Sequence, residues 1–146
     1  MVKYGRQFAA SLSALSSTMD ELQNLDYTYY KGALKAMLNS RDPLPPLHTD
    51  FAGDGPEAEA MRALDASFRR SLLADIADVN ACFGVQCSGL RARMDEAAAL
   101  EPSHGNAVRQ ELGALLLELH RWAALNYLAV LKIVKKHDKS GMLAPL

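Results

Sequence analysis

The feature that most limits the fold is an apolar pattern with helical spacing that continues through residues 57–101. Apolar side chains recur there three, four or seven residues apart, which is typical of an amphipathic helix. Gly55 and Pro56 precede the pattern, and Glu57 and Glu59 follow at once, as expected for a helix start with Pro at its first position and acids in its first turn. At 1.5 Å per residue this predicted helix would be about 65 Å long. The apolar positions are Met61, Leu64, Phe68, Leu72, Val79, Phe83, Leu90 and Met94.

A second long helix is predicted over residues 105–139. Residues 101–105 break the first pattern with Pro102 and Gly105, and a new apolar pattern then begins. The positions expected to face inward are Val108, Leu112, Leu115, Leu119, Trp122, Tyr127, Val130 and Val134. The sequence therefore predicts two long antiparallel helices joined by a tight turn.

The N-terminal part, residues 1–40, is predicted to form a helical hairpin. Its second helix carries an apolar stripe formed by Tyr30, Leu34, Met37 and Leu38. Either Asn24 or Asp26 would cap it. Residues 41–56 are rich in Pro and Gly and are predicted to be a long loop. No segment alternates apolar and polar residues, so the expected fold class is all-α. We predict one domain, residues 1–146, in which the hairpin packs on the two long helices as an elongated helical bundle.

A stripe of lysines lies near the end of the second long helix. Lys132, Lys135, Lys136 and Lys139 fall within an arc of about 100°, and the expected core face is on the opposite side. Like charges at this spacing repel each other, at a cost of about 0.2–0.5 kcal/mol per pair. The helix dipole explains one or two cations at a C-terminus but not four on one face. We therefore expect an anion to bind there.

Composition and motifs argue against several functions. The net charge of −1 over 146 residues is unlike that of a general nucleic-acid binder. There is no phosphate-binding loop, nucleophile elbow or isolated carboxylate pair, so we expect no enzyme activity. The carboxylates at Asp75, Asp78, Asp95 and Glu96, and the arginines at 69–70 and 91–93, are interpreted as a solvated outer face.

The metal-ligating residue types are scattered rather than clustered. The four histidines, His48, His104, His120 and His137, lie in different segments and are interpreted as solvated or capping residues, so no metal site or cofactor is expected. Cys82 and Cys87 diverge by about 140° on a helix and are interpreted as reduced packing residues of a cytoplasmic protein. The longest apolar stretch is interrupted by Asn126 and Lys132, so no transmembrane segment is predicted.

Three short segments together resemble a known family. They are Lys3-Tyr4-Gly5-Arg6, the stretch from Asn24 to Lys31, and the stretch from Leu125 to Lys139, and their order and separations resemble those of the SPX domain. The resemblance covers essentially the whole chain. It implies a sensor domain in phosphate homeostasis that binds inositol polyphosphates or pyrophosphates, such as inositol hexakisphosphate, in a lysine-rich surface cluster. The residues implied for ligand binding are Lys3, Tyr27, Lys31, Lys35, Lys132, Lys135, Lys136 and Lys139.

The resemblance also implies partners and a location. An SPX-like domain regulates an attached or partner protein in the cytoplasm, in some cases tethered to the cytosolic face of a membrane through its parent protein. Two alternatives remain open at this stage. One is a structural helical adaptor that associates or dimerises through its long helices, and the other is a non-specific binder of anionic surfaces.

Overall fold

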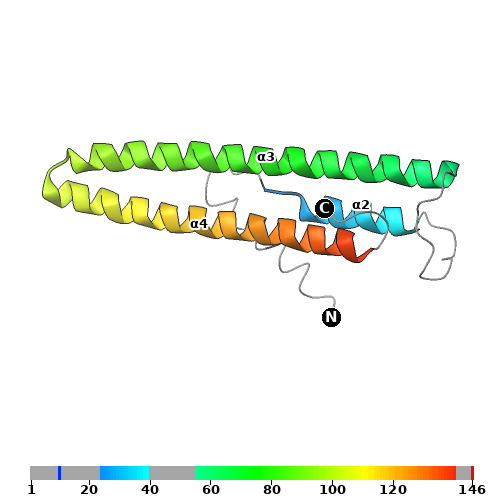
Figure 1. Cartoon of the computed structure of the whole chain (residues 1–146). Helices are drawn as coiled ribbons and strands as arrows, with labels where there is room; N and C mark the ends of the chain where they lie inside the picture. Colours follow the sequence, from blue (N-terminus) through cyan, green and yellow to red (C-terminus); the bar gives the residue numbers. More distant parts are fainter. Residues whose placement is uncertain (1–9, 11–23, 40–54, 141–145) are drawn as a thin grey trace. The chain divides into compact units, whose positions relative to one another are not determined.

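The computed structural model is all-α, and it describes residue 10, residues 24–39, residues 55–140 and residue 146. Within these ranges the helices of the fold are α2 (Tyr27–Asn39), α3 (Pro56–Ala98) and α4 (Pro102–Lys139) (Figure 1). The two long helices predicted for residues 57–101 and 105–139 are thus confirmed, with bounds that differ by at most three residues. The first helix of the predicted hairpin and most of the predicted loop at 41–56 lie outside the described residues.

The helix starts follow from side chains that satisfy free backbone groups. Asp26 caps α2, because its carboxylate accepts a hydrogen bond from the Tyr29 amide at 2.8 Å. Pro56 and Pro102 each occupy the first position of a long helix, where the missing N–H has no partner to lose. The predicted start of the second long helix at residue 105 is therefore three residues late.

The turn between α3 and α4 is tight because Gly105 lets two backbones approach. A Cβ at this buried position would meet the carbonyl oxygen of Ala97 at 3.1 Å. The Gly105 amide donates to the Glu101 carbonyl at 2.8 Å, and the Leu100 amide donates to the Ala97 carbonyl at 3.3 Å. Gly105 thus lies inside α4, where its lack of a side chain allows the close passage of α3.

The chain divides into two compact units, and each of the long helices contributes to both. Unit 1 contains residues 77–128 together with Asn24 and Leu25, and it includes the turn between the long helices. Unit 2 contains α2, residues 56–76 of α3 and residues 129–139 of α4. Within each unit the α3 segment runs antiparallel to the α4 segment.

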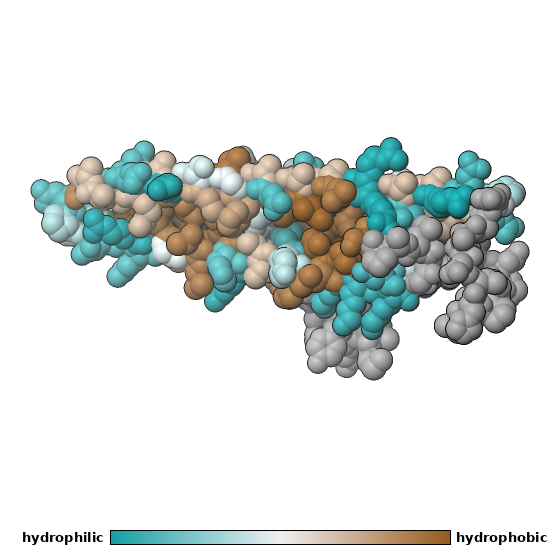
Figure 2. Space-filling model, in the orientation of Figure 1, coloured by the Kyte–Doolittle hydropathy of each residue, from teal (hydrophilic) through white to brown (hydrophobic). Residues whose placement is uncertain are grey.

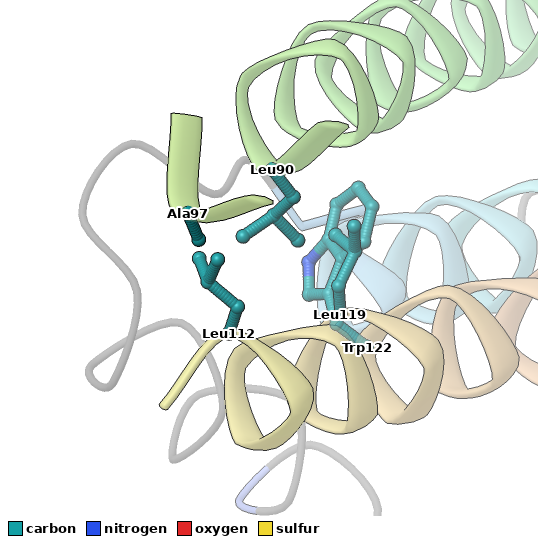
Figure 3. Close-up of a cluster of buried hydrophobic side chains, with 5 residues drawn as sticks. All are labelled: Leu90, Ala97, Leu112, Leu119 and Trp122. Atoms are coloured by element: carbon teal, nitrogen blue, oxygen red, sulfur yellow. The ribbon is translucent and has the colours of Figure 1, made fainter. Parts of the chain in front are cut away.

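Unit 1 has an apolar core. Leu90 and Ala97 of α3 point toward Leu112, Leu119 and Trp122 of α4 (Figure 3). Around them lie half-buried side chains that complete the seam between the helices. These are Val79, Cys82, Cys87, Val108, Leu115 and Ala123. The Cys82 and Cys87 side chains pack at the edge of this core, in agreement with their interpretation as packing residues.

The residues just before α2 are tied to α4 by neutral hydrogen bonds. The Trp122 indole donates to the Asn24 side chain at 2.7 Å, and the Asn126 side-chain oxygen accepts from the Leu25 amide at 2.9 Å. Asn126 also donates to the Trp122 carbonyl at 2.9 Å. Asn24 therefore contacts α4, and the side chain that caps α2 is Asp26. A buried asparagine on α4 is tolerated because these partners satisfy its polar atoms.

The inward face of α4 matches the prediction in the first half of the helix, where Leu112, Leu119 and Trp122 are buried, and differs from it over residues 126–137. In unit 2 the buried positions of α4 are Ala129, Ile133 and His137, whereas Val130 and Val134 are only half-buried. In unit 1 Tyr127, predicted to face inward, is 64% exposed. At 100° per residue the observed face is rotated by about 90° from the predicted one. The prediction was wrong because it excluded the polar residues Asn126 and His137, which are buried.

Some positions of α2 and α3 also differ from the prediction. Met61, Phe68, Leu72 and Leu90 are buried as expected. The side chains of Leu64, Phe83, Met94 and Leu38 are instead partly exposed. Asp65 is buried and occupies the place on the core stripe that had been assigned to Leu64. The observed 61-65-68-72 spacing is as helical as the predicted one, so periodicity alone does not separate them.

Candidate functional site

The lysine stripe of α4 lies in unit 2, at the C-terminal end of the helix. Lys135, Lys136 and Lys139 are exposed, and Lys132 is half-buried. The centre of the stripe is about 110° from the buried face of Ala129, Ile133 and His137. The stripe therefore flanks the core face. The sequence had predicted that it would lie on the opposite side. Hydrophilic surface lies over this end of α4 in the view of Figure 2.

The lysines of α2 belong to the same compact unit. Lys31 and Lys35 are exposed, and Tyr27 is buried with 8% of its surface accessible. The buried side of α2 is formed by Tyr27, Tyr30, Leu34 and Met37. Tyr27 therefore serves the core of unit 2, while the two lysines one and two turns later point to solvent. Lys3, the remaining predicted site residue, lies outside the described residues.

The lysine-bearing turns of α2 and α4 pack against the same aromatic ring. Tyr30, next to Lys31, makes an edge contact with Phe68 of α3 at a centroid distance of 5.6 Å. His137, next to Lys136, stacks on the same Phe68 ring, also at 5.6 Å. Because Lys31 and Lys136 are the chain neighbours of Tyr30 and His137, these contacts bring their backbones to one part of α3.

The exposed lysines have little local compensation for their charge. Among the residues that the structure describes, no salt bridge is formed by Lys31, Lys35, Lys135, Lys136 or Lys139. Positive charge at the end of α4 is favourable for the helix dipole, but the lysines also repel one another. The result is a concentration of ammonium groups on two neighbouring helices that can each donate to an anion.

Asp138 is an acidic residue in the last turn of α4, outside the arc of the lysine stripe, and it is already hydrogen-bonded. Its carboxylate accepts from the Leu146 amide at 3.0 Å and contacts the His137 ring at 3.1 Å. The pKa of Asp138 is held below its usual range, mainly by the hydrogen bond from the Leu146 amide and to a smaller extent by the contact with the His137 ring. Asp138 is therefore ionised near neutral pH.

A buried ion pair beneath the stripe was missed by the sequence reading. The Nε2 atom of His137 lies 2.5 Å from the Oδ1 atom of Asp65, and the Nε atom of Arg69 lies 2.5 Å from the Oδ2 atom. His137 is thus a core residue and not a solvated or capping one, and Arg69 is not part of a solvated face. The available signal was Asp65 itself, a carboxylate that shares a helical stripe with Met61 and Phe68.

Tyr30 and Asp75 form a second polar contact inside unit 2. The Tyr30 hydroxyl donates to the Asp75 carboxylate at 2.5 Å. Burial, followed by this hydrogen bond, raises the pKa of Tyr30 far above its usual value of 10. Asp75 is half-buried, so its interpretation as part of a solvated outer face was wrong.

Comparisons with models of protein families, with curated proteins and with solved structures give no match for this chain. In the part of the chain that the structure describes, no three histidine, cysteine or acidic side chains are grouped so that they could hold a metal ion. None of the described helices has an apolar stretch long enough to cross a membrane.

Proposed function

We propose that this chain is an SPX-like sensor that binds an inositol polyphosphate or pyrophosphate and regulates an attached or partner protein in phosphate homeostasis. The observation that carries the proposal is the joint packing of Tyr30 and His137 on Phe68. Through these contacts, lysine-bearing turns from the beginning and the end of the chain share one compact unit. The SPX resemblance of the segments around Lys31 and Lys136 points to the same two helices.

The chemistry of the cluster suits a compact polyanion. A highly phosphorylated inositol ring carries phosphates in several directions, and separate ammonium groups can meet them as point charges. Hydrogen bonds between ionised partners are about twice as strong as neutral ones. A single phosphate ion would engage only a fraction of the lysines. We therefore expect inositol hexakisphosphate to bind at least about 100-fold more tightly than inorganic phosphate.

Calorimetry at near-physiological salt tests the proposal. Inositol hexakisphosphate, inorganic phosphate and sulfate are titrated into the wild-type chain and into the Lys136→Ala variant. Loss of one charge-assisted contact should weaken binding of the first ligand about tenfold. Arg91→Ala, which removes an exposed cation from unit 1, is the matched control and should bind normally.

Two further variants sharpen the result. Lys136→Arg keeps the charge and changes its geometry, so it should bind more tightly than Lys136→Ala. Tyr27→Phe removes only the hydroxyl from a buried ring and tests whether that group reaches the ligand. Equal affinity for inositol hexakisphosphate and sulfate, or equal weakening by Arg91→Ala and Lys136→Ala, would refute a specific site and favour general attraction to anionic surfaces.

One observation favours a second candidate function, a helical association module. In unit 1, α4 exposes the side chains of Leu116, Leu117, Tyr127 and Leu128. Hydrophobic surface is visible along part of α4 in Figure 2. Sedimentation of the wild-type chain and of a Leu117→Glu variant would test this candidate. A concentration-dependent dimer that the variant loses would support association, and a monomer at all concentrations would exclude it.

A further inference from the structure

His137 is the most enclosed titratable side chain beneath the lysine stripe. Only 1% of its side chain is accessible, and both ring nitrogens face carboxylates. Nε2 contacts Asp65 of α3, and Nδ1 contacts Asp138 of α4 at 3.1 Å. Ionised carboxylates accept hydrogen bonds but do not donate them. A ring nitrogen that carries a proton donates to the carboxylate that it faces, so the two contacts can tie His137 to both α3 and its own helix.

The neighbours of His137 hold the ring in one orientation. Phe68 lies parallel to it, with an interplanar angle of 16°, and Arg69 occupies the second oxygen of Asp65. A buried carboxylate that loses its charged partner is strongly destabilising. The contact between Asp65 and His137 is thus a directional tie between α3 and the last turns of α4, seventy-two residues apart in sequence.

These last turns need such a tie. Helix ends fray, because their final carbonyls have no intrahelical partner, and here the repulsion between lysines adds to the tendency. Three residues after His137, Ser140 donates two hydrogen bonds to the His137 carbonyl, one from its amide at 3.0 Å and one from its hydroxyl at 2.5 Å. His137 therefore fixes the helix from the inside at the place where Lys135, Lys136 and Lys139 project to the outside.

We infer that His137 is a positioning residue that, through its contacts with Asp65 and Asp138, holds Lys135, Lys136 and Lys139 in one arrangement for a polyanionic ligand. The inference rests on the proposed function for the identity of the ligand. It adds that affinity depends on a buried side chain that does not touch the ligand. Fixed cations bind more tightly than mobile ones, because less conformational freedom is lost on binding.

Amide hydrogen exchange of the His137→Phe variant is the first test. Phenylalanine keeps the stacking on Phe68 and removes both nitrogen contacts. Exchange of the amides of residues 135–139 should become at least about tenfold faster, whereas the amides of residues 112–122 in unit 1 should be unaffected. The matched control is His120→Phe, which changes an exposed histidine on the same helix.

A second variant separates positioning from general stability. Asp65→Leu/His137→Phe also removes the buried carboxylate, whose Oδ1 atom would lose its partner in His137→Phe alone while Oδ2 keeps Arg69. Replacing a buried ion pair with apolar residues commonly preserves the fold. The melting temperature should stay near that of the wild type. The affinity for inositol hexakisphosphate should nevertheless fall about threefold to tenfold, although every lysine is present.

The outcomes distinguish this inference from the proposed function. If the wild-type chain does not bind inositol hexakisphosphate, the proposed function fails, and the exchange measurement alone decides whether His137 orders the end of α4. If the wild type binds and the double variant has wild-type exchange and wild-type affinity, the inference is overturned while the proposed function stands.

Discussion

The two compact units join α3 to α4 through side chains of different chemistry. Unit 1 joins α3 and α4 through Leu90, Leu119 and Trp122, and its buried polar groups are neutral amides. Unit 2 joins three helices through aromatic rings and includes a buried pair between Asp65 and His137. A buried ion pair is poor evidence for stability, because apolar residues of similar volume serve as well or better. We therefore expect apolar packing to contribute most of the stability of unit 1, and the Asp65–His137 contact to fix the geometry of unit 2.

The largest expected effect would test the role of unit 1. Trp122→Ala should lower the free energy of unfolding by about 3–5 kcal/mol, because it leaves a cavity in the core and removes a partner of Asn24. Urea denaturation followed by circular dichroism measures the loss. Leu117→Ala, at a position 51% exposed on the same helix, is the control and should change stability by less than about 0.5 kcal/mol. Similar losses for both variants would mean that this cluster is not the core of the unit.

The next effect concerns the buried pair of unit 2. Asp65→Asn should lower the free energy of unfolding by about 3 kcal/mol, since His137 and Arg69 lose the charge that they share. Asp78→Asn, an exposed acid on α3, should change it little. Chemical denaturation of the two variants side by side gives the measurement. If Asp65→Asn is as stable as the wild type, the buried pair does not hold unit 2 together.

Tyr30 makes the stability of unit 2 depend on pH in the alkaline range. Its folded-state pKa is raised, so the folded protein retains the phenolic proton after the unfolded chain has lost it. The stability from Tyr30 is therefore complete below about pH 10 and declines as the pH rises further, toward the folded-state pKa. Tyr30→Phe should cost about 1.5 kcal/mol at neutral pH, through the lost hydrogen bond to Asp75.

Thermal unfolding between pH 8 and pH 11 would measure this dependence. The wild type should lose stability above about pH 10, and the Tyr30→Phe variant should lose less over the same interval. Tyr127→Phe, at an exposed position of unit 1, is the control and should follow the wild type. An identical decline in all three proteins would show that Tyr30 does not cause it.

The smallest expected effects come from the glycines of unit 1. A Cβ added at Gly84 or Gly89, both exposed on α3, would meet no other atom within 4 Å. Gly84→Ala and Gly89→Ala should therefore each raise the free energy of unfolding by about 0.5–1 kcal/mol. Gly105→Ala should lower it, because the new methyl group would press on the Ala97 carbonyl. Thermal melts of the three variants would show stabilisation at all three positions if that close approach were not real.

Much of the secondary structure was predictable, because it depends on local chemistry. Apolar side chains at helical spacing, with Pro56 and Pro102 at the starts, were enough to place the two long helices within three residues of their observed bounds. The same spacing placed four lysines within an arc of about 100° at the end of α4. Neither result requires knowledge of which helix contacts which.

The inward face of α4 beyond Trp122 and the ring contacts of unit 2 were decided only by tertiary structure. Asn126 and His137 are buried because their partners, Leu25 and Asp65, come from distant parts of the chain. Burial of a polar side chain is unfavourable until such a partner is present, so hydropathy along one helix assigns it to the surface. The sequence by itself thus determined the helices, where their charges lie and the core side of α4 as far as Trp122, and long-range hydrogen bonding decided which side of its second half became the core.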